Sequence, residues 1–318
     1  MKNPTIKTQN FGVEIEMTGI TRCEAAQVIA DYYGTTSSYL GTYYKTYGAT
    51  DRKGRTWKAM SDASIETQKR SNGRKVAAGT DYSCEVVTPI LQYEDMEDLQ
   101  NIIRALVAKG AFANKSCGIH VHVDGARHTP ESLTRLLNFA VGRQDLFYEA
   151  LQIGARSDRW CHKMSKALLV AMKNDETKTK ASAERIWYSR SNDGYTGGVS
   201  HEHYNSTRYH GINLHAFFTK GTVEFRLFNG TTHAGKIKAY IQFCLAMSAW
   251  ALETKTDNLY FKGIAGYTDE QKAAIMKRAL INRLGLSGPE FKTCRLHLTS
   301  VWTNSEEAAQ AAPPGKGE

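Results

Sequence analysis

The clearest alternation of apolar and polar residues lies near the start of the chain, at residues 11–19. Successive side chains of a strand point to opposite faces. We therefore predict a strand here with one apolar face and one acidic face, the latter carrying Glu14 and Glu16. Similar patterns, or a high content of Tyr, Thr and Trp, predict four further strands, at residues 39–50, 55–60, 83–91 and 117–124.

Helical spacing of apolar residues and capping signals predict six helices, at residues 21–33, 94–109, 129–153, 165–173, 234–252 and 269–284. Thr21 is expected to be the N-cap of the first helix, with Glu24 completing a capping box. Thr129 and Pro130 suit the N-cap and first position of the third. The polar, basic segment 66–82 is expected to be an exposed loop.

Two alternating runs flank Lys220-Gly221 and predict a β-hairpin over Arg208–Gly230. The symmetric register would pair Phe218 with Val223, Ala216 with Phe225, and Leu214 with Leu227. The opposite, polar face would then carry Asn213, His215, Glu224 and Arg226. This face is either a functional surface or a solvated one with a cross-strand ion pair, and the hairpin alone does not decide between them.

Strands outnumber helices early in the chain, which favours an α+β fold with a mostly antiparallel sheet and helices packed on one face. The 318 residues are enough for one large domain or two modest ones. We expect a catalytic domain over residues 1–255, with an irregular basic insertion at 155–207 as a substrate-specificity region. A C-terminal helical and strand extension would follow at 256–303, and a disordered tail at 304–318.

Composition narrows the environment and the partners. Lys and Arg number 41 against 32 Asp and Glu, so the net charge of +9 favours anionic partners. The chain shows no apolar run near 18 residues and no apolar signal segment at its start, so we expect a cytoplasmic protein without a membrane span. Six cysteines without a CxxC pair predict reduced, structural thiols.

Placed in one sheet, the polar strand faces would collect several chemically active side chains: Glu14, Glu16, Glu85, His120, His122 and Glu224, with Arg226 and Arg208 nearby. Neighbouring carboxylates repel unless a positive charge neutralises them, and Mg²⁺ and Mn²⁺ prefer oxygen ligands with an occasional imidazole. Metals and arginines on one surface suit phosphoryl transfer. The sequence contains neither GxxxxGK[ST] nor GxGxxG, so a nucleotide would be held by metals on the sheet.

Each part of this group also has a simpler interpretation. Glu-x-Glu is common on solvated strands, and a strand HxH can be a zinc pair, although no third nitrogen or sulfur ligand is apparent. His201-Glu202-His203 is interpreted as a surface loop. Cys84 and Cys117 could form a Cys/His nucleophile, but both are expected to face the apolar side.

Six short motifs occur in an order that resembles the amidoligase family of carboxylate–amine ligases, related to glutamate–cysteine ligases and glutamine synthetases. They are GVEIE (12–16), WKAMSDAS (57–64), CEVVTP (84–89), CGIHVHV (117–123), RYHGINL (208–214) and TVEFRLF (222–228). The resemblance covers roughly residues 11–250. It implies a glutamine-synthetase-like fold with a curved sheet, with ATP and divalent cations bound on the sheet face opposite the helices.

The resemblance also implies a role for each matching residue. The metal ligands would be Glu14, Glu16, Glu85, Glu224 and His120. ATP would be contacted by His120 or His122, by Asn213 and by Arg226. Arg226 would hold the transferring phosphoryl group, Arg208 the phosphate or the substrate carboxylate, and Asp62 the incoming amine or its proton.

Three functions compete on these grounds. The first is an ATP-dependent ligase that forms an amide or isopeptide bond through an acyl phosphate, from small-molecule or peptide carboxylates and amines. The second is a phosphotransferase of the guanidino-kinase type on the same fold. The third is a non-enzymatic nucleic-acid or peptide-binding protein, suggested by the basic charge. We favour the ligase, because carboxylates on several strands of one face need a function and basic charge is generic; nucleic acid is therefore not the expected partner.

Overall fold

The computed structural model describes residues 4–190, 198–256 and 263–303, and its chain divides into two compact units. We call residues 10–121 and 228–240 the sheet unit, and residues 1–9, 122–227 and 241–318 the helical unit. The boundaries fall within strands β8 (Gly118–Asp124) and β10 (Thr222–Asn229).

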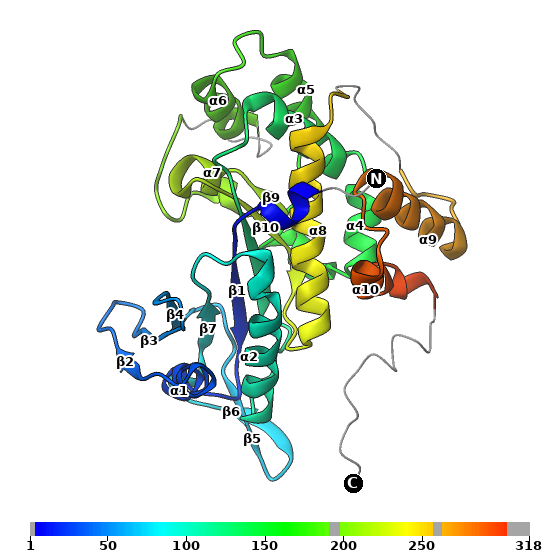
Figure 1. Cartoon of the computed structure of the whole chain (residues 1–318). Helices are drawn as coiled ribbons and strands as arrows, with labels where there is room; N and C mark the ends of the chain where they lie inside the picture. The colour runs from blue at the N-terminus through cyan, green and yellow to red at the C-terminus, as the bar shows by residue number, and fades with distance from the viewer. Residues whose placement is uncertain (1–3, 191–197, 257–262, 304–318) are drawn as a thin grey trace. The chain divides into compact units, whose positions relative to one another are not determined.

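The sheet unit is built on strands in the order β2-β3-β4-β7-β1-β8. Their bounds are β1 Phe11–Met17, β2 Ser37–Tyr39, β3 Tyr47–Thr50, β4 Thr56–Met60 and β7 Cys84–Val87. The pairings of β1 with β7, and of β4 with β3 and β7, are antiparallel. Helix α1 (Arg22–Tyr33) packs on β2, β3, β4 and β7 and contacts α2 (Met96–Ala108). Figure 1 shows these elements in blue to cyan. The expected α+β class with a large antiparallel sheet is confirmed.

Local signals position α1 as the sequence predicts. The Thr21 side chain accepts from the Glu24 backbone N–H, and the Glu24 carboxylate accepts from the Thr21 backbone N–H at 2.9 Å, which completes the capping box. Gly34 ends the helix in the left-handed conformation, with φ of 69°. These caps fix where the chain enters and leaves the helix that covers the sheet.

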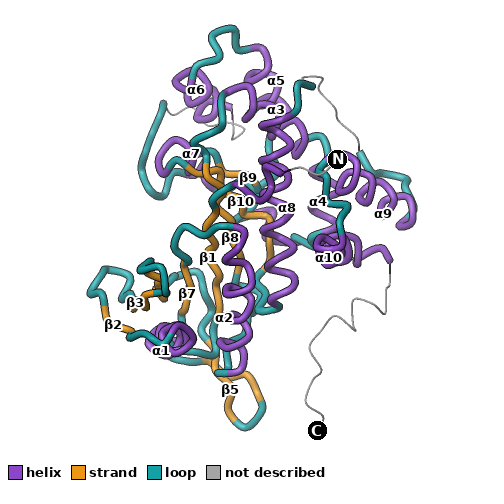
Figure 2. Tube along the Cα trace, in the orientation of Figure 1, coloured by secondary structure: helices purple, strands orange, loops and turns teal. Residues whose placement is uncertain are grey.

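The segment 66–82 is exposed, as expected, but it is not a loop. It contains a separate two-stranded hairpin of β5 (Gln68–Ser71) and β6 (Arg74–Ala77), visible as the orange part of the tube near the label β5 in Figure 2. Asn72 and Gly73 form its two-residue turn, both with positive φ, at 48° and 74°. Asn-Gly is a strong signal for such a turn, but the two strands have no apolar face, so the pattern of apolar residues does not indicate them.

The helical unit contains strands in the order β8-β10-β9 and most of the helices. The bounds are α3 Pro130–Val141, α4 Gln144–Ala150, α5 Lys166–Asn174, α6 Lys180–Arg190, β9 Ile212–Asn213, α7 His215–Lys220, α9 Asp269–Arg278 and α10 Lys292–Thr303; α8 Ala234–Glu253 begins in the sheet unit. Short 3₁₀ turns lie at Pro4–Thr8, Thr80–Tyr82, Tyr93–Asp95, Gly154–Asp158, Ser206–Arg208 and Pro289–Phe291, and a π-helical turn at Ala279–Arg283.

The predicted helix 129–153 is two helices, interrupted between Val141 and Gln144, and α6 was not predicted. The expected tail at 304–318 lies outside the described residues, and the expected domain division stays a prediction.

The predicted hairpin over Arg208–Gly230 is wrong. Residues His215–Lys220 form helix α7, which Gly221 ends with φ of 77°. Strand β9 pairs antiparallel with β10, placing Asn213 opposite Glu224. A glycine in the left-handed region can end a helix or form a hairpin turn. The sequence pattern around Gly221 is compatible with both, and the prediction chose the turn. The register differs from the predicted one by an even number of residues, so Asn213 and Glu224 still share a face.

A buried chain of hydrogen bonds joins three elements of the helical unit. The ring nitrogens of His128 lie 3.0 Å from Ser132 Oγ and 2.8 Å from Ser248 Oγ. Ser248 Oγ in turn donates to Gln9 Oε1 at 2.5 Å. Burial, and then the charges of Arg127 and Arg135, lower the pKa of His128 to about 4. The imidazole is therefore neutral near pH 7 and packs as a polar core residue.

We expect acid to destabilise the protein through His128. The unfolded imidazole has a pKa of about 6.5, so between that value and about 4 the unfolded state binds the proton that the folded state excludes. The free energy of unfolding should fall as pH drops through this window, by up to about 1.4 kcal/mol per pH unit from this group. The free energy of unfolding, measured with urea from pH 4 to 7, should depend less steeply on pH in His128→Gln than in wild type. An equally steep pH dependence in the variant would contradict the assignment.

Among the residues that the structure describes, no helix is both long enough and apolar enough to cross a membrane.

Candidate metal and nucleotide site

A compact acidic group lies on three neighbouring strands of the sheet unit. Glu14 and Glu16 are on β1, Glu85 is on β7 and His120 is on β8. Glu16 lies directly opposite Glu85 in the antiparallel register. Alternation along β1 sends the apolar residues to the core and both glutamates to the other face, as the sequence predicts.

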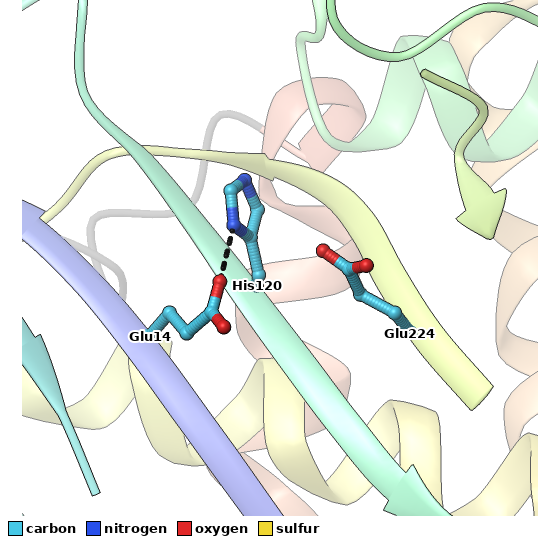
Figure 3. A group of neighbouring side chains, drawn as sticks. All are labelled: Glu14, His120 and Glu224. Carbon is cyan, nitrogen blue, oxygen red and sulfur yellow. Dashed lines mark hydrogen bonds and ion pairs between the residues drawn. The ribbon is translucent and has the colours of Figure 1, made fainter. Parts of the chain in front are cut away.

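The side chains of this group converge. One ligand atom each of Glu16, Glu85 and His120 lies within 4.8 Å of the others, and all three residues are buried. His120 Nδ1 lies 3.0 Å from Glu14 Oε2, the contact dashed in Figure 3, and His120 Nε2 lies 3.9 Å from Glu16 Oε1. The Gly118 backbone N–H donates to Glu16 Oε2 at 2.6 Å. His120 thus lies among three of the predicted metal-binding carboxylates.

These residues fit a hard divalent cation. The three carboxylates gathered around this imidazole lie in a mostly buried position and repel one another electrostatically, since burial weakens the screening by water. Mg²⁺ and Mn²⁺ take oxygen ligands, with imidazole tolerated. The donor set contains no thiolate, which distinguishes it from a structural zinc site.

A second polar group lies in the helical unit, on β9 and β10. Glu224 Oε2 accepts from Asn213 Nδ2 at 2.6 Å, and Glu224 Oε1 accepts from Arg226 Nη1 at 2.6 Å. All three residues are buried. The Arg226 guanidinium also lies 5.9 Å from the centre of the Tyr209 ring, and its Nε donates to the Trp160 carbonyl at 3.4 Å. The guanidinium is therefore held in one orientation, which is what phosphate recognition requires.

Two other predicted residues lie near this second group. His122 Nδ1 lies 2.9 Å from Thr222 Oγ1, and His122 Nε2 lies 3.9 Å from Glu224 Oε1. Arg208 donates from Nη1 to the His203 carbonyl at 2.7 Å. The sequence could not choose between His120 and His122; the structure gives each of them different neighbours.

Asp62 lies in the sheet unit, just after β4 (Thr56–Met60). Its Oδ1 accepts from the Ser64 backbone N–H at 2.6 Å, and its backbone N–H donates to Ser83 Oγ at 3.0 Å. These contacts form a turn beside β7, and they account for the residue structurally without invoking the incoming amine.

Sequence reasoning missed a pocket in the helical unit. Its polar lining comes from His201, His203, Arg208, Asn213, His215, Thr219, Lys220 and Glu224. His201 and His203 lie at the surface, as interpreted from the sequence, but they also border this pocket. Their HEH pattern matches no motif, and Lys220 looked like a turn residue, so only the fold brings them together.

The cysteines take no part in either group. All six are described and none forms a disulfide. Burial raises the pKa of Cys84 to about 12, so its thiol stays protonated and is no nucleophile at neutral pH. The expectation of structural thiols is confirmed for the five buried cysteines, and Cys23 is exposed.

Comparison with known proteins connects this geometry to a family. A family model described as "Putative amidoligase enzyme" matches residues 7–248. Among solved structures, a bifunctional glutathione synthetase from Pasteurella multocida is similar at 14% sequence identity and a TM-score of 0.39, over 97% of this chain and 50% of that one. The chain thus spans half the length of that structure. No curated protein matches the sequence.

The family match covers well over half of the chain and includes every motif noted above. The chain belongs to the amidoligase family.

Proposed function

We propose that the protein is an ATP-dependent carboxylate–amine ligase that works through an acyl phosphate. The observation that carries this proposal is the buried group of Glu16, Glu85 and His120, with Glu14 beside it. Carboxylates gathered this closely call for a neutralising positive charge, and the group suits a cation that accompanies a nucleotide. Family membership supports this reaction class.

In this proposal Glu14, Glu16, Glu85 and His120 hold Mg²⁺ or Mn²⁺. When bound, the metal would neutralise charge on the phosphates of ATP. We retain Glu224 among the predicted metal ligands, although its contacts with Asn213 and Arg226 also suit a role in positioning the guanidinium. We also propose that the fold is glutamine-synthetase-like, with the site on the polar face of the sheet.

The reaction has two steps. A substrate carboxylate oxygen attacks the γ-phosphorus of ATP, and the bond to the β–γ bridging oxygen breaks, releasing ADP. The amine then attacks the carbonyl carbon of the acyl phosphate, the C–O bond to phosphate breaks, and the nitrogen loses a proton. We assign Arg226 to the phosphoryl oxygens, Arg208 to phosphate or substrate carboxylate, and His122 and Asn213 to the nucleotide side. The role of Asp62 toward the amine proton stays a prediction from the family resemblance.

A hydroxylamine-trapping assay tests the chemistry before the natural amine is known. Hydroxylamine replaces the amine and converts an acyl phosphate into a hydroxamate, which gives a coloured ferric complex. Screening a set of carboxylic acids with ATP and Mg²⁺ should yield one or more hydroxamates with an equal amount of ADP. ¹⁸O in the reacting carboxylate should appear in the released phosphate.

The same assay separates the competing functions. A phosphotransferase of the guanidino-kinase type would make ADP and a phosphorylated acceptor but no hydroxamate and no ¹⁸O-labelled phosphate. If no ATP analogue binds with any divalent metal in a calorimetric titration, both the ligase and the phosphotransferase proposals fail.

A further inference from the structure

The pocket in the helical unit carries more positive charge than its surroundings neutralise. Arg208 and Lys220 line it, and Glu224 is the carboxylate of its lining. Both Glu224 oxygens already accept hydrogen bonds, from Asn213 and from Arg226. Among the residues that the structure describes, no carboxylate forms an ion pair with Arg208 or Lys220. The pocket therefore favours a negatively charged ligand.

Arg208 is fixed in place without losing its charge. Its Nη1 donates to the His203 backbone carbonyl at 2.7 Å, and its guanidinium lies 5.6 Å and 5.7 Å from the ring centres of Tyr204 and Tyr209. A carbonyl and two aromatic rings orient a guanidinium but do not neutralise it. The remaining N–H groups stay available for an oxyanion.

The imidazoles at the pocket are also held by neighbours. His215 Nδ1 lies 2.6 Å from the hydroxyl of Tyr188, and His201 Nε2 lies 2.6 Å from Glu184 Oε1. Burial, and then the charge of Arg208, lower the pKa of His215 to about 4, so this ring is neutral near pH 7. His215 therefore shapes the pocket wall and does not add to its charge.

Other ligand classes fit this lining poorly. A metal ion held within this pocket would need several carboxylate or imidazole ligands, whereas Glu224 is the one carboxylate of the lining. Ala216 is the one apolar residue among those that line the pocket. The cavity of about 140 Å³ is also small beside the ~300–1,000 Å³ of pockets that hold drug-sized ligands, so it suits one anionic group and a few further atoms.

We propose that this pocket binds a carboxylate group of the ligase's own substrate, held by Arg208 and Lys220. That this ligand is the substrate rests on the proposed function, whereas its carboxylate chemistry is inferred from the pocket itself. Lys220 and the two surface histidines would then belong to substrate recognition. An oxyanion of this kind could also come from a nucleotide phosphate, and the experiment separates the two sources.

The test is calorimetric titration of the full chain with acetate, succinate and tricarballylate at constant ionic strength, without nucleotide, and separately with Mg·ADP. The variants are Arg208→Gln and Lys220→Gln. Lys220→Gln removes a side chain that makes no hydrogen bond in the described structure, so its folding should be unaffected. Lys173→Gln is the matched control, because Lys173 lies in the last turn of α5 as Lys220 does in α7, but outside the pocket.

We expect wild type and Lys173→Gln to bind the di- or tricarboxylate alike, and both pocket variants to bind it at least ~10-fold more weakly, the effect of losing one charge-assisted hydrogen bond. Failure of every carboxylate to bind wild type would overturn the proposal, as would equal binding by all variants. Loss of Mg·ADP binding alone would make this a phosphate site and also overturn it. Carboxylate binding without nucleotide binding would leave the pocket standing and remove the ATP-dependent ligase.

Discussion

Replacing Glu16 and Glu85 together by glutamine should abolish Mg²⁺-dependent ATP turnover and leave the sheet unit folded. The two carboxylates lie directly opposite each other and are buried, and like charges in this position are destabilising. In metal-free buffer the Glu16→Gln/Glu85→Gln variant should therefore be at least as stable as wild type. Glutamine keeps an oxygen that can accept from the Gly118 N–H, which alanine would leave unsatisfied.

Thermal and urea unfolding with and without Mg²⁺ provide the measurement. A cation that binds only the folded state stabilises it by ~2.7 kcal/mol at a hundred times its Kd, and this gain should be present in wild type and absent in the variant. The matched control is Glu66→Gln/Glu97→Gln, which removes two exposed carboxylates of the same unit. Marked destabilisation of the Glu16/Glu85 variant in metal-free buffer, or retained stabilisation by Mg²⁺, would remove the group as a metal site.

Arg226→Lys should lower the rate of ATP turnover by a factor of about 10²–10³, the usual effect of losing one preorganised donor to a developing anion. Lysine keeps the positive charge beside Glu224 but cannot present a planar fork to phosphate. The hydroxylamine assay with any active carboxylate gives the rate. Turnover close to that of wild type would exclude Arg226 from the phosphoryl site.

A paired variant separates catalysis from folding at this position. Arg226→Met alone leaves the buried Glu224 without its guanidinium partner, which should cost roughly 3–5 kcal/mol of stability. Adding Glu224→Gln removes the stranded charge and keeps an oxygen for the Asn213 amide, so stability should largely return while turnover stays lost. Recovery of turnover together with stability would show that Arg226 acts only through the fold.

The sequence predicts this fold best where one short stretch decides the structure. The alternation along β1 places Glu14 and Glu16 correctly, and Thr21 with Glu24 correctly begins α1. Prediction failed where the same sequence pattern is compatible with two local structures. Gly221 with φ of 77° closes a short helix where a hairpin turn was expected.

The candidate site divides in the same way. Glu85 and His120 were grouped with the β1 glutamates because alternation alone assigns them to the polar face of their strands. The pocket could not be found by pattern, because His201 and Lys220 are distant in the sequence and belong to a loop and a helix end. Their shared surroundings depend on tertiary packing, which residue spacing does not encode.

The path of the chain through the two units limits how the protein can be dissected. The chain changes unit after Gln9, Val121, Leu227 and Tyr240, so neither unit is one continuous stretch. A fragment starting at β1 would lose Gln9, whose side-chain amide donates to the Leu245 carbonyl at 2.9 Å and accepts from Ser248. Truncation cannot isolate either unit intact, and assigning functions to them will depend on point substitutions in the whole chain.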